Sequence, residues 1–477
     1  MDEQAMIHEL TNILGADRVS QAEDVVTKYA RDTWPFRLVE RKFRSIQEMP
    51  LCVIHPKTTE DVSKTLAFLN KKGVNVVPYG GGSSVTGAAE STRHSVVINM
   101  GKMNNILHLN KENLTVTAQP AIIMAQLEKW LNEQDFIAGH YPQSIELAQL
   151  GGLISTRSSG QFSTKYGNIE DLLIGLEAVL PNGDIVRIKN NPRRSTGPDL
   201  RQLFLGAEGI FGIITEVTLK VFPKPADRWS QAYAFESVRK GLESIQQFMQ
   251  AGWKPAVVRL HDEFETSQKY TKYLNKGEAI LLLISEGPEG YAQVEGHALN
   301  KIVQANGGRP LGVGPVEAWF EHRNEVGALE KLTSRGMIVD TIEISAMWSD
   351  IANIYEQVTK RLRNEVPELI AISGHASHAY MQGTNIYFVL ATKPLQNLDE
   401  VKRVYWSIWN IVMEVTLAND GSICHHHGIG KLRAQWMPAE LGSSYSLLEL
   451  IKRSLDPNGI MNKGTLLPLE EQKLVDR

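Results

Sequence analysis

The chain has 477 residues, a length that predicts two or three domains rather than one core. Its 50 Lys and Arg residues against 54 Asp and Glu residues give a net charge of −4, which excludes a general attraction to nucleic acid or to an anionic membrane. The longest aliphatic run, 279–284, is far shorter than a membrane span, and the acidic N-terminus lacks an apolar signal segment. Two distant cysteines, Cys52 and Cys424, favour a reduced, cytoplasmic protein.

The hydrophobic pattern divides the chain into four parts. Their expected bounds are 1–45, 46–225, 226–418 and 419–477. The first part is helical, the second alternates short strands with helices, and the third has longer helices between strands such as 279–284 and 386–390. Pro223 and Pro225 mark the second boundary, because proline cannot donate to a sheet ladder.

Local signals in the first two parts predict individual elements. Ser20 and Glu23 form a capping-box pattern that predicts the start of a short helix. A helix over 58–72 is expected to end at Gly73, which suits the left-handed position after a helix. The expected strands are 51–54, 74–78, 95–99, 172–180 and 184–188, the last two forming a hairpin around a Pro-Asn-Gly turn.

The segment 78–87, PYGGGSSVTG, is the first candidate ligand site. Its three consecutive glycines let several backbone N–H groups point at one anion, and two serines add hydroxyl donors, so a phosphate or pyrophosphate is the expected guest. A mononucleotide P-loop is excluded because Ala88 stands where lysine is required. A Rossmann fingerprint is excluded because a strand follows instead of a helix. A plain glycine-rich turn stays open for this loop alone.

Two further segments combine small residues with hydroxyl groups. The first runs from HYPQS at 140–144 to GGLISTRSSG at 151–160, and the second is EGIFGIIT at 208–215. We interpret both as loops between apolar strands. Three such loops on one domain indicate an extended ligand contacted by backbone groups throughout.

Three consecutive histidines, His425, His426 and His427, lead into a Gly-Ile-Gly-Lys turn that ends at Lys431. Imidazole exchanges protons readily near neutral pH, and the lysine suits an anionic ligand. If 422–427 is extended, His425 and His427 share one face and His426 takes the other. The run also allows a metal site, in which His375 and His378 would join His426.

Taken together, the motifs resemble a known family. The segments PYGGGSSVTG, GGLISTRSSG, VLPNGD, GAEGIFGIITEVTLKVFP and DPNGIMNKGT resemble those of the vanillyl-alcohol-oxidase (PCMH-type) flavoproteins, over residues 20–467. The resemblance implies an α+β fold with a PCMH-type FAD-binding domain of two α/β subdomains. It also implies a cap domain that binds the substrate and has an antiparallel sheet flanked by helices. A homodimer is a further family expectation.

The resemblance implies that FAD lies between the glycine loop and the cap domain. Relatives that attach flavin covalently use a histidine in the glycine loop, where this chain has Gly82 and Ser83, so FAD is expected to be non-covalent. The candidate cofactor-binding residues are Pro78, Tyr79, Gly80, Gly81, Gly82, Ser83, Ser84, Pro142, Gln143, Ser144, Gly151, Gly152, Ser155, Thr156, Arg157, Ser158, Glu208, Gly209, Gly212, Ile213 and Ile214.

One branch of the family is more similar than the rest. NPRRSTGPD, Tyr387 in NIYF and CHHHGIGKLRAQW are similar to alkyldihydroxyacetonephosphate synthases and to bacterial FAD-linked oxidoreductases. The similarity implies that Tyr387 is the catalytic acid or base, with the three histidines as catalytic neighbours around flavin and substrate. The similarity also implies that Arg259 and Arg323 bind the anionic group of the substrate, which agrees with the bidentate recognition of phosphate or carboxylate by arginine. Lys431, beside the histidine run, is assigned to the same anionic substrate. A tyrosine base would need cationic neighbours to lower its pKa.

The related 2-hydroxy-acid dehydrogenases bear on the metal alternative. They have a similar layout with a histidine and a glutamate at the positions of Tyr387 and His426, and the exchange of both weakens a divalent site. We therefore expect no metal, with His375, His378 and His426 as the alternative ligands.

Two activities remain open. The first is an oxidoreductase for a small anionic hydroxylated substrate. The second is an alkyldihydroxyacetonephosphate synthase that exchanges acyl for alkyl through a flavin N5 adduct. The short, polar segment 265–277 offers little access for a fatty alcohol, so we prefer the oxidoreductase. A flavin-binding protein without catalysis would leave Tyr387, the arginines and the histidine run unexplained.

Overall fold

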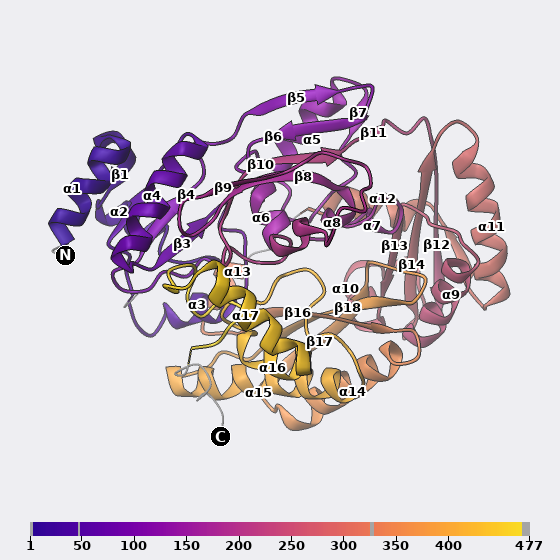
Figure 1. The fold of residues 1–477 in the computed structure, drawn as a ribbon. Coiled ribbons are helices and arrows are strands. Elements are labelled where there is room, and N and C mark those ends of the chain that lie inside the picture. The colour runs from indigo at the N-terminus through magenta and orange to yellow at the C-terminus, as the bar shows by residue number, and fades with distance from the viewer. Residues whose placement is uncertain (1–2, 46–47, 325–328, 470–477) are drawn as a thin grey trace.

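The computed structural model describes residues 3–45, 48–324 and 329–469 (Figure 1). The described strands form a four-stranded sheet, a five-stranded sheet, a two-stranded ribbon and a seven-stranded sheet. Helices accompany each large sheet, which confirms the predicted α+β class. Among the described helices, none has the combined length and apolar character of a membrane span.

The four-stranded sheet forms the first subdomain. Its elements are α1 (Glu3–Leu14), β1 (Val19–Ser20), α2 (Glu23–Lys28), α3 (Pro35–Glu40), β2 (Cys52–Ile54), α4 (Thr59–Lys72), β3 (Val76–Tyr79) and β4 (Val96–Asn99). The strand order is β1-β2-β4-β3, with β2, β4 and β3 parallel. The strands expected near 51–54, 74–78 and 95–99 are therefore confirmed.

Helix ends in this subdomain test the capping predictions. Thr58 caps α4, and Gly73 after it takes a left-handed φ of 68°, as predicted. The capping box predicted at Ser20 is wrong. Ser20 belongs to β1, α2 begins only after Ala22, and the Ser20 hydroxyl accepts a hydrogen bond from the Ala22 N–H at 3.3 Å.

The five-stranded antiparallel sheet forms the second subdomain. Its elements are β5 (Ile106–Asn110), β6 (Thr115–Ala118), α5 (Met124–Asn132), α6 (Leu150–Ser155), α7 (Ser163–Tyr166), α8 (Ile169–Leu172), β8 (Leu173–Val179), β9 (Ile185–Ile188) and β10 (Ile213–Lys220). The strand order is β5-β6-β10-β8-β9, and β8 and β9 form the predicted hairpin. A two-stranded ribbon of β7 (Phe136–Ile137) and β11 (Phe222–Pro223) joins it.

Residues 150–155 depart from the prediction. They were expected in a loop but form α6, because Leu150, Leu153 and Ile154 are buried in the core of this subdomain. Gly151 lets the helix approach the preceding chain, since a β-carbon there would come within 2.7 Å of the Pro120 Cβ. Close packing therefore accounts for one of the glycines in the motif.

The seven-stranded antiparallel sheet follows. Its elements are β12 (Asp227–Phe235), α9 (Val238–Gln250), β13 (Val257–His261), α10 (Glu263–Lys269), β14 (Ala279–Gly287), α11 (Tyr291–Ala305), β15 (Arg309–Gly312), α12 (Gly314–His322), α13 (Leu329–Thr333), β16 (Val339–Met347), α14 (Ile351–Glu365), β17 (Leu369–Ala376), β18 (Gly383–Thr392) and α15 (Leu398–Ala418). The strand order is β15-β12-β14-β13-β17-β18-β16. Helices α9, α11, α14 and α15 bury one face in the main hydrophobic core (Figure 1).

The C-terminal segment returns to the first subdomain. Ser422 bridges to Ser345 of β16, and the N–H groups of Lys431 and Leu432 both donate to the Thr86 carbonyl at 3.0 Å. The segment continues through α16 (Met437–Leu441) and α17 (Tyr445–Leu455) to Met461, which bridges to β3. The histidine run is thereby held between the seven-stranded sheet and the glycine loop.

Candidate active site

A row of polar side chains crosses one face of the seven-stranded sheet. His261 of β13 lies opposite His375 of β17, His375 opposite Tyr387 of β18, and Tyr387 opposite Glu343 of β16. The alternate residues of these strands turn to the other face and join the apolar core beneath the helices. Directly opposed side chains lie within contact distance, so the register alone assembles this row.

Tyr387 sits at the centre of the row. Its ring stacks on His375 with a centroid distance of 4.8 Å and on His426 at 5.8 Å, and the edge of His427 approaches it at 5.3 Å. Burial raises the pKa of Tyr387 to about 12 and outweighs the opposite effect of Arg259. The prediction of a pKa lowered by cationic neighbours is therefore wrong, and Tyr387 rests as a phenol at neutral pH.

Arg259 lies beside this tyrosine and is hydrogen-bonded to two histidines. Its guanidinium donates to the Nε2 atoms of His261 at 3.1 Å and of His375 at 2.9 Å. Arginine only donates, so both Nε2 atoms are unprotonated and both Nδ1 atoms carry the proton. Those Nδ1 atoms face Glu265, at 3.0 Å from His261 and 2.9 Å from His375. Burial lowers the pKa of His375 to about 3, which keeps this imidazole neutral.

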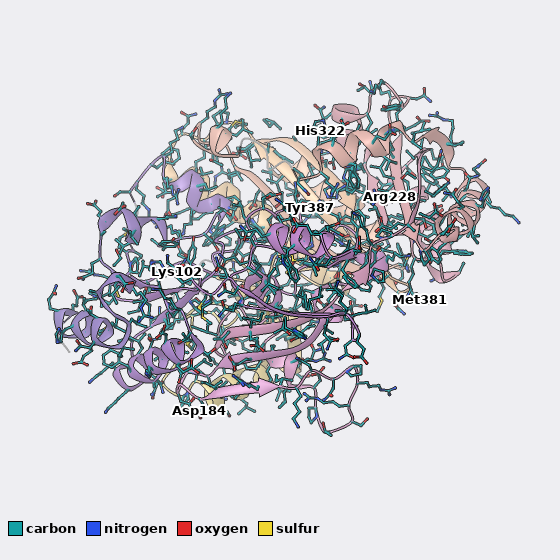
Figure 2. The ribbon with its side chains drawn as sticks, turned by 90° about the horizontal axis from the view of Figure 1, so that it is seen from above. Lys102, Asp184, Arg228, His322, Met381 and Tyr387 are labelled. Atoms are coloured by element: carbon teal, nitrogen blue, oxygen red, sulfur yellow. The ribbon has the colours of Figure 1, made fainter. Side chains whose placement is uncertain are left out.

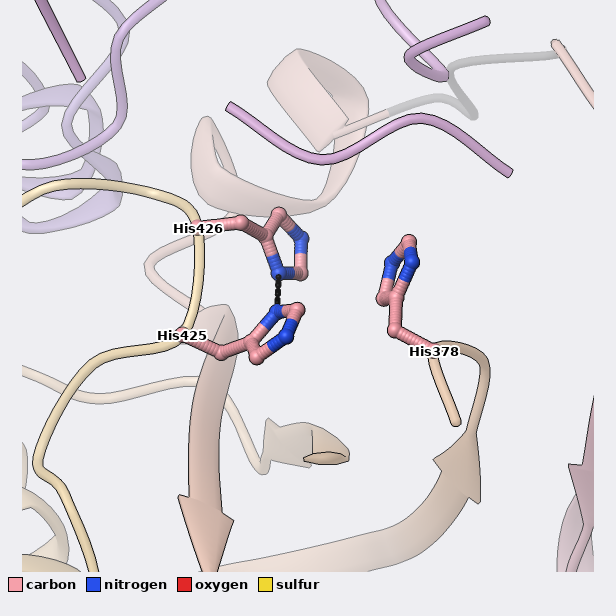
Figure 3. Close-up of side chains that lie close together, drawn as sticks. All are labelled: His378, His425 and His426. Carbon is pink, nitrogen blue, oxygen red and sulfur yellow. Dashed lines mark hydrogen bonds between the residues drawn. The ribbon is translucent and has the colours of Figure 1, made fainter. Parts of the chain in front are cut away.

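The histidine run is not extended. Residues 425–427 form a bend, in which the Nδ1 atoms of His425 and His426 lie 2.9 Å apart (Figure 3). His378, at the end of the chain leaving β17, stacks on His425 with a centroid distance of 4.9 Å. The predicted alternation of faces is wrong, because the backbone N–H groups of His426 and His427 both turn to Glu343 Oε1, at 3.1 and 2.6 Å.

Glu343 and Arg433 are functional residues that the sequence reasoning missed. Both are fully buried, and they form an ion pair with each other. Arg433 also donates to the Gly428 carbonyl at 2.8 Å, so the pair holds both ends of the histidine bend. A charged residue in the apolar strand TIEISAM was a usable signal, because a charge buried in a sheet requires a partner.

The glycine loop has the donors that a phosphate group requires. The backbone N–H groups of residues 81–84 donate no hydrogen bond within the described chain. Gly81 lets the loop lie against the chain at Leu147, since a β-carbon there would come within 2.2 Å of the Leu147 carbonyl oxygen. Gly82 takes a left-handed φ of 68°. Pro78, Tyr79 and Gly80 lead into the loop from β3. The backbone donors of residues 81–84, Ser83 among them, fit the pyrophosphate of FAD. The Ser84 hydroxyl instead lies 3.1 Å from the Thr86 hydroxyl.

The other candidate cofactor residues fall into two groups. Those of residues 142–158 lie on α6 and its flanking turns, where the hydroxyls of Ser155 and Thr156 donate to carbonyls of the same helix and Arg157 pairs with Glu170. Ser158 contacts the buried His140 at 3.1 Å. Pro142, Gln143 and Ser144 lie before α6, and Gly151 and Gly152 lie on it.

The second group surrounds the start of β10. Ile213 and Ile214 are buried strand residues. Gly209 packs so closely on Pro78 that a β-carbon would come within 2.7 Å of it, and a β-carbon on Gly212 would come within 2.4 Å of the Val179 carbonyl oxygen. The carboxylate of Glu208 accepts hydrogen bonds from the N–H groups of Ile429 and Gly430 at 2.7 and 2.9 Å. Glu208 therefore stabilises the turn after the histidine run.

Arg323 and Lys431 are not brought to the row around Tyr387. The guanidinium of Arg323 lies on the Phe320 ring at 3.8 Å and lines a cavity of about 200 Å³ that Arg228 also lines. Viewed from above, Tyr387 lies near the middle of the molecule and Arg228 is displaced to one side (Figure 2). Lys431 donates to the Glu90 carbonyl on the first subdomain. Of the three predicted substrate residues, only Arg259 contacts the row.

The metal alternative is also rearranged. The structure groups His378 and His426 with His425, and it places His375 with His261 and Glu265 instead. In the second group the imidazole nitrogens already face Arg259 and Glu265. The predicted trio of His375, His378 and His426 is therefore wrong. His375 on β17 faces Arg259 and Glu265, whereas His378, two residues after the end of this strand, stacks on His425.

Comparisons with known proteins agree with this architecture. Residues 50–189 match a family described as FAD binding domain, and residues 224–466 match one described as FAD linked oxidases, C-terminal domain. The uncharacterized FAD-linked oxidoreductase YgcU of Escherichia coli (strain K12) is 38% identical over 98% of this chain and 99% of its own length. An alkyldihydroxyacetonephosphate synthase of Caenorhabditis elegans is 29% identical over 89% of this chain and 77% of its own length.

A solved structure gives the same result for the fold. That of p-cresol methylhydroxylase with substrate bound has a TM-score of 0.78 at 18% identity and covers 98% of this chain and 97% of that chain. The predicted PCMH-type fold and the FAD cofactor are confirmed by these matches. The chain belongs to the FAD-linked oxidoreductase family and is a FAD-dependent flavoenzyme.

Proposed function

We propose that this flavoenzyme oxidises a small hydroxylated substrate that carries a carboxylate or phosphate, with non-covalently bound FAD. The observation that supports the proposal is the single row His261–His375–Tyr387–Glu343, with Arg259 beside it and the histidine bend above it. Arg259 is a half-buried cation whose partners on one side are neutral imidazoles, so an anionic substrate group is its natural counter-ion.

His427 is the proposed base. Its Nδ1 atom is buried, has no hydrogen-bond partner in the described chain, and lies 3.8 Å from Glu343 Oε2. Burial lowers the pKa of His427 and outweighs the opposite effect of the Glu343 carboxylate, so the resting ring is neutral. With its proton on Nδ1, on the side of Glu343, the ring has Nε2 left to take the proton of the substrate hydroxyl. Bound FAD would supply the hydride acceptor. Tyr387 donates a hydrogen bond to the same substrate oxygen, because its raised pKa keeps the phenol protonated. In the reverse reaction His427 returns the proton that it took.

The state of the cofactor is testable without a substrate. We expect the purified protein to be yellow, and heat or acid denaturation to release FAD into the protein-free filtrate, since no histidine stands in the glycine loop at Gly82 or Ser83. Absorbance spectra of filtrate and pellet make the measurement. Flavin retained in the pellet would contradict the non-covalent mode, and a colourless protein that takes up no FAD would contradict the cofactor.

The alternative function is an alkyldihydroxyacetonephosphate synthase. The observation in its favour is the 29% identity to the synthase of Caenorhabditis elegans. Against it stands the segment from α10 to β14, residues 270–278, which is short and contributes only Tyr270, Tyr273 and Leu274 as apolar side chains. We therefore prefer the oxidoreductase.

Anaerobic mixing distinguishes the two activities. The FAD-loaded protein is mixed with a panel of 2-hydroxy acids and phosphorylated alcohols, and absorbance is followed with oxygen excluded. The oxidoreductase predicts lasting loss of the oxidised-flavin absorbance with at least one of these compounds. Incorporation of a labelled fatty alcohol into acyl-dihydroxyacetone phosphate without lasting flavin reduction would instead establish the synthase.

A further inference from the structure

A chain of hydrogen bonds runs from the histidine bend to α8. His426 Nδ1 lies 2.9 Å from His425 Nδ1, and His425 Nε2 lies 2.8 Å from the Tyr380 hydroxyl (Figure 3 shows the first contact). Asn168 Nδ2 then donates to Tyr380 at 2.9 Å. Tyr380 and Asn168 were not among the predicted site residues. The chain links a buried polar group on α8 to an imidazole that stacks on Tyr387.

The direction of this chain follows from its outer end. Asn168 is the N-cap of α8 and forms a capping box with Asp171, while its Oδ1 accepts from the Ser159 hydroxyl at 2.7 Å. The amide oxygen is therefore turned away from Tyr380, and the NH₂ group faces it. Tyr380 already accepts from Asn168, and an unmade hydrogen bond from its part-buried hydroxyl is costly. Ser159 also neighbours this hydroxyl, but the close contact is with His425 Nε2 at 2.8 Å, so we direct the Tyr380 proton there.

The proton positions of both histidines follow in turn. His425 Nε2 accepts from Tyr380, so the proton of neutral His425 is on Nδ1 and donates to His426 Nδ1. His426 then carries its own proton on Nε2. Burial lowers the pKa of His425 to about 4 and lowers that of His426, which agrees with two neutral rings.

We propose that Asn168 and Tyr380 are positioning residues that hold His425 in the Nδ1–H form and His426 in the Nε2–H form. In this form His426 is not a base. It donates a hydrogen bond from Nε2 to an anionic oxygen of the substrate. The tautomers are independent of the proposed function. Only the donation to a substrate oxygen rests on it. Together with Arg259, the His426 donor selects a carboxylate or phosphate oxygen over a neutral group.

A bound cation is the competing explanation for the same side chains. His378, His425 and His426 each offer a ligand atom, and these atoms lie within 4.8 Å of one another. A metal-bound histidine carries the proton on its outer nitrogen and donates it to an acceptor. Coordination of a cation through His425 Nδ1 would therefore require a proton on His425 Nε2. Tyr380 would then have to accept one hydrogen bond from His425 and another from Asn168. The observed hydrogen bonds therefore favour the proposed hydrogen-bond chain over a bound cation, and the experiment below distinguishes the two.

The decisive experiment reads the tautomers directly. Histidine is labelled with ¹⁵N in the FAD-loaded protein, and the signals of the two rings are assigned with His425→Gln and His426→Gln. We expect protonated Nδ1 on His425 and protonated Nε2 on His426. In Asn168→Asp the carboxylate accepts from Tyr380, and both assignments should reverse at neutral pH, while Asp keeps the N-cap of α8. Unchanged tautomers in Asn168→Asp would overturn the proposal, as would zinc chloride binding at one equivalent with loss of the His425 Nδ1 proton.

Turnover tests the functional half with the substrate found by anaerobic mixing. Tyr380→Phe and Asn168→Asp should retain FAD, lower kcat roughly tenfold or more and raise KM for the anionic substrate. The matched control is Tyr166→Phe, two residues before Asn168 but outside the hydrogen-bond chain. It removes a part-buried hydroxyl that donates to Glu286 at 2.7 Å, and it should retain wild-type kinetics. The activity of Asn168→Asp relative to wild type should recover as pH falls and the introduced carboxyl, beside Glu170 and Asp171, regains a proton. Loss without this recovery, or wild-type kinetics in both variants, would overturn the donor role.

Discussion

Tyr387→Phe is expected to lower kcat by about 10²- to 10³-fold, the usual cost of removing a hydrogen-bond donor aimed at the reacting oxygen, while the FAD content stays unchanged. Phe keeps the ring stacked on His375 and His426 and removes only the hydroxyl. Since the pKa of the phenol is raised to about 12, the lost group is a proton donor at every pH of ordinary assay. Single-turnover flavin reduction and steady-state kinetics measure the effect.

Tyr233→Phe is the matched control for this variant. Tyr233 is buried in β12 of the same sheet, and its hydroxyl bonds Asn300 outside the polar row. It should show wild-type kcat. Full activity in Tyr387→Phe would remove the tyrosine from the chemistry, and equal losses in both variants would assign the effect to the sheet and not to the site.

Glu343→Gln is expected to be the most destabilising change near the site, by about 3–5 kcal/mol, because it leaves Arg433 as a buried charge without its carboxylate. It should also lower activity, since the same carboxylate holds the N–H groups of His426 and His427. The denaturant midpoint of the FAD-loaded protein, followed by tryptophan fluorescence, measures stability. Glu356→Gln, in an exposed pair with Arg239, is the control and should shift the midpoint little.

The pH dependence of this difference has a definite sign. Arg433 holds the pKa of Glu343 far below its ordinary value of about 4.3. A lowered pKa in the folded state stabilises the protein above the ordinary pKa, and that contribution is lost as pH falls toward the folded value. The gap between wild type and Glu343→Gln should therefore be full near neutral pH and shrink below about pH 4. A gap that grows on acidification would contradict the ion pair.

Local patterns predicted much of the framework. The helix α4 with its cap at Thr58 and its end at Gly73, the hairpin β8–β9 and the glycine loop were readable because each depends on neighbours within a few residues. The same locality explains two errors. Ser20 does not cap a helix, because it pairs with β2 as part of a strand. Residues 150–155 are helical because the core of the second subdomain buries their apolar side chains.

The amino-acid sequence by itself determined the family and the FAD cofactor, and it singled out Tyr387, Arg259 and the histidine run as candidates, because these depend on motifs. Only the tertiary structure decided what these residues touch. Three hydrogen-bonded pairs are far apart in the sequence. Glu343 and Arg433 are separated by 90 residues, Glu208 and Gly430 by 222 residues, and Tyr380 and His425 by 45 residues. Strand register and buried hydrogen bonds join these positions, and burial keeps Tyr387 in its phenol form. Such pairings require burial in three dimensions, which no local spacing encodes.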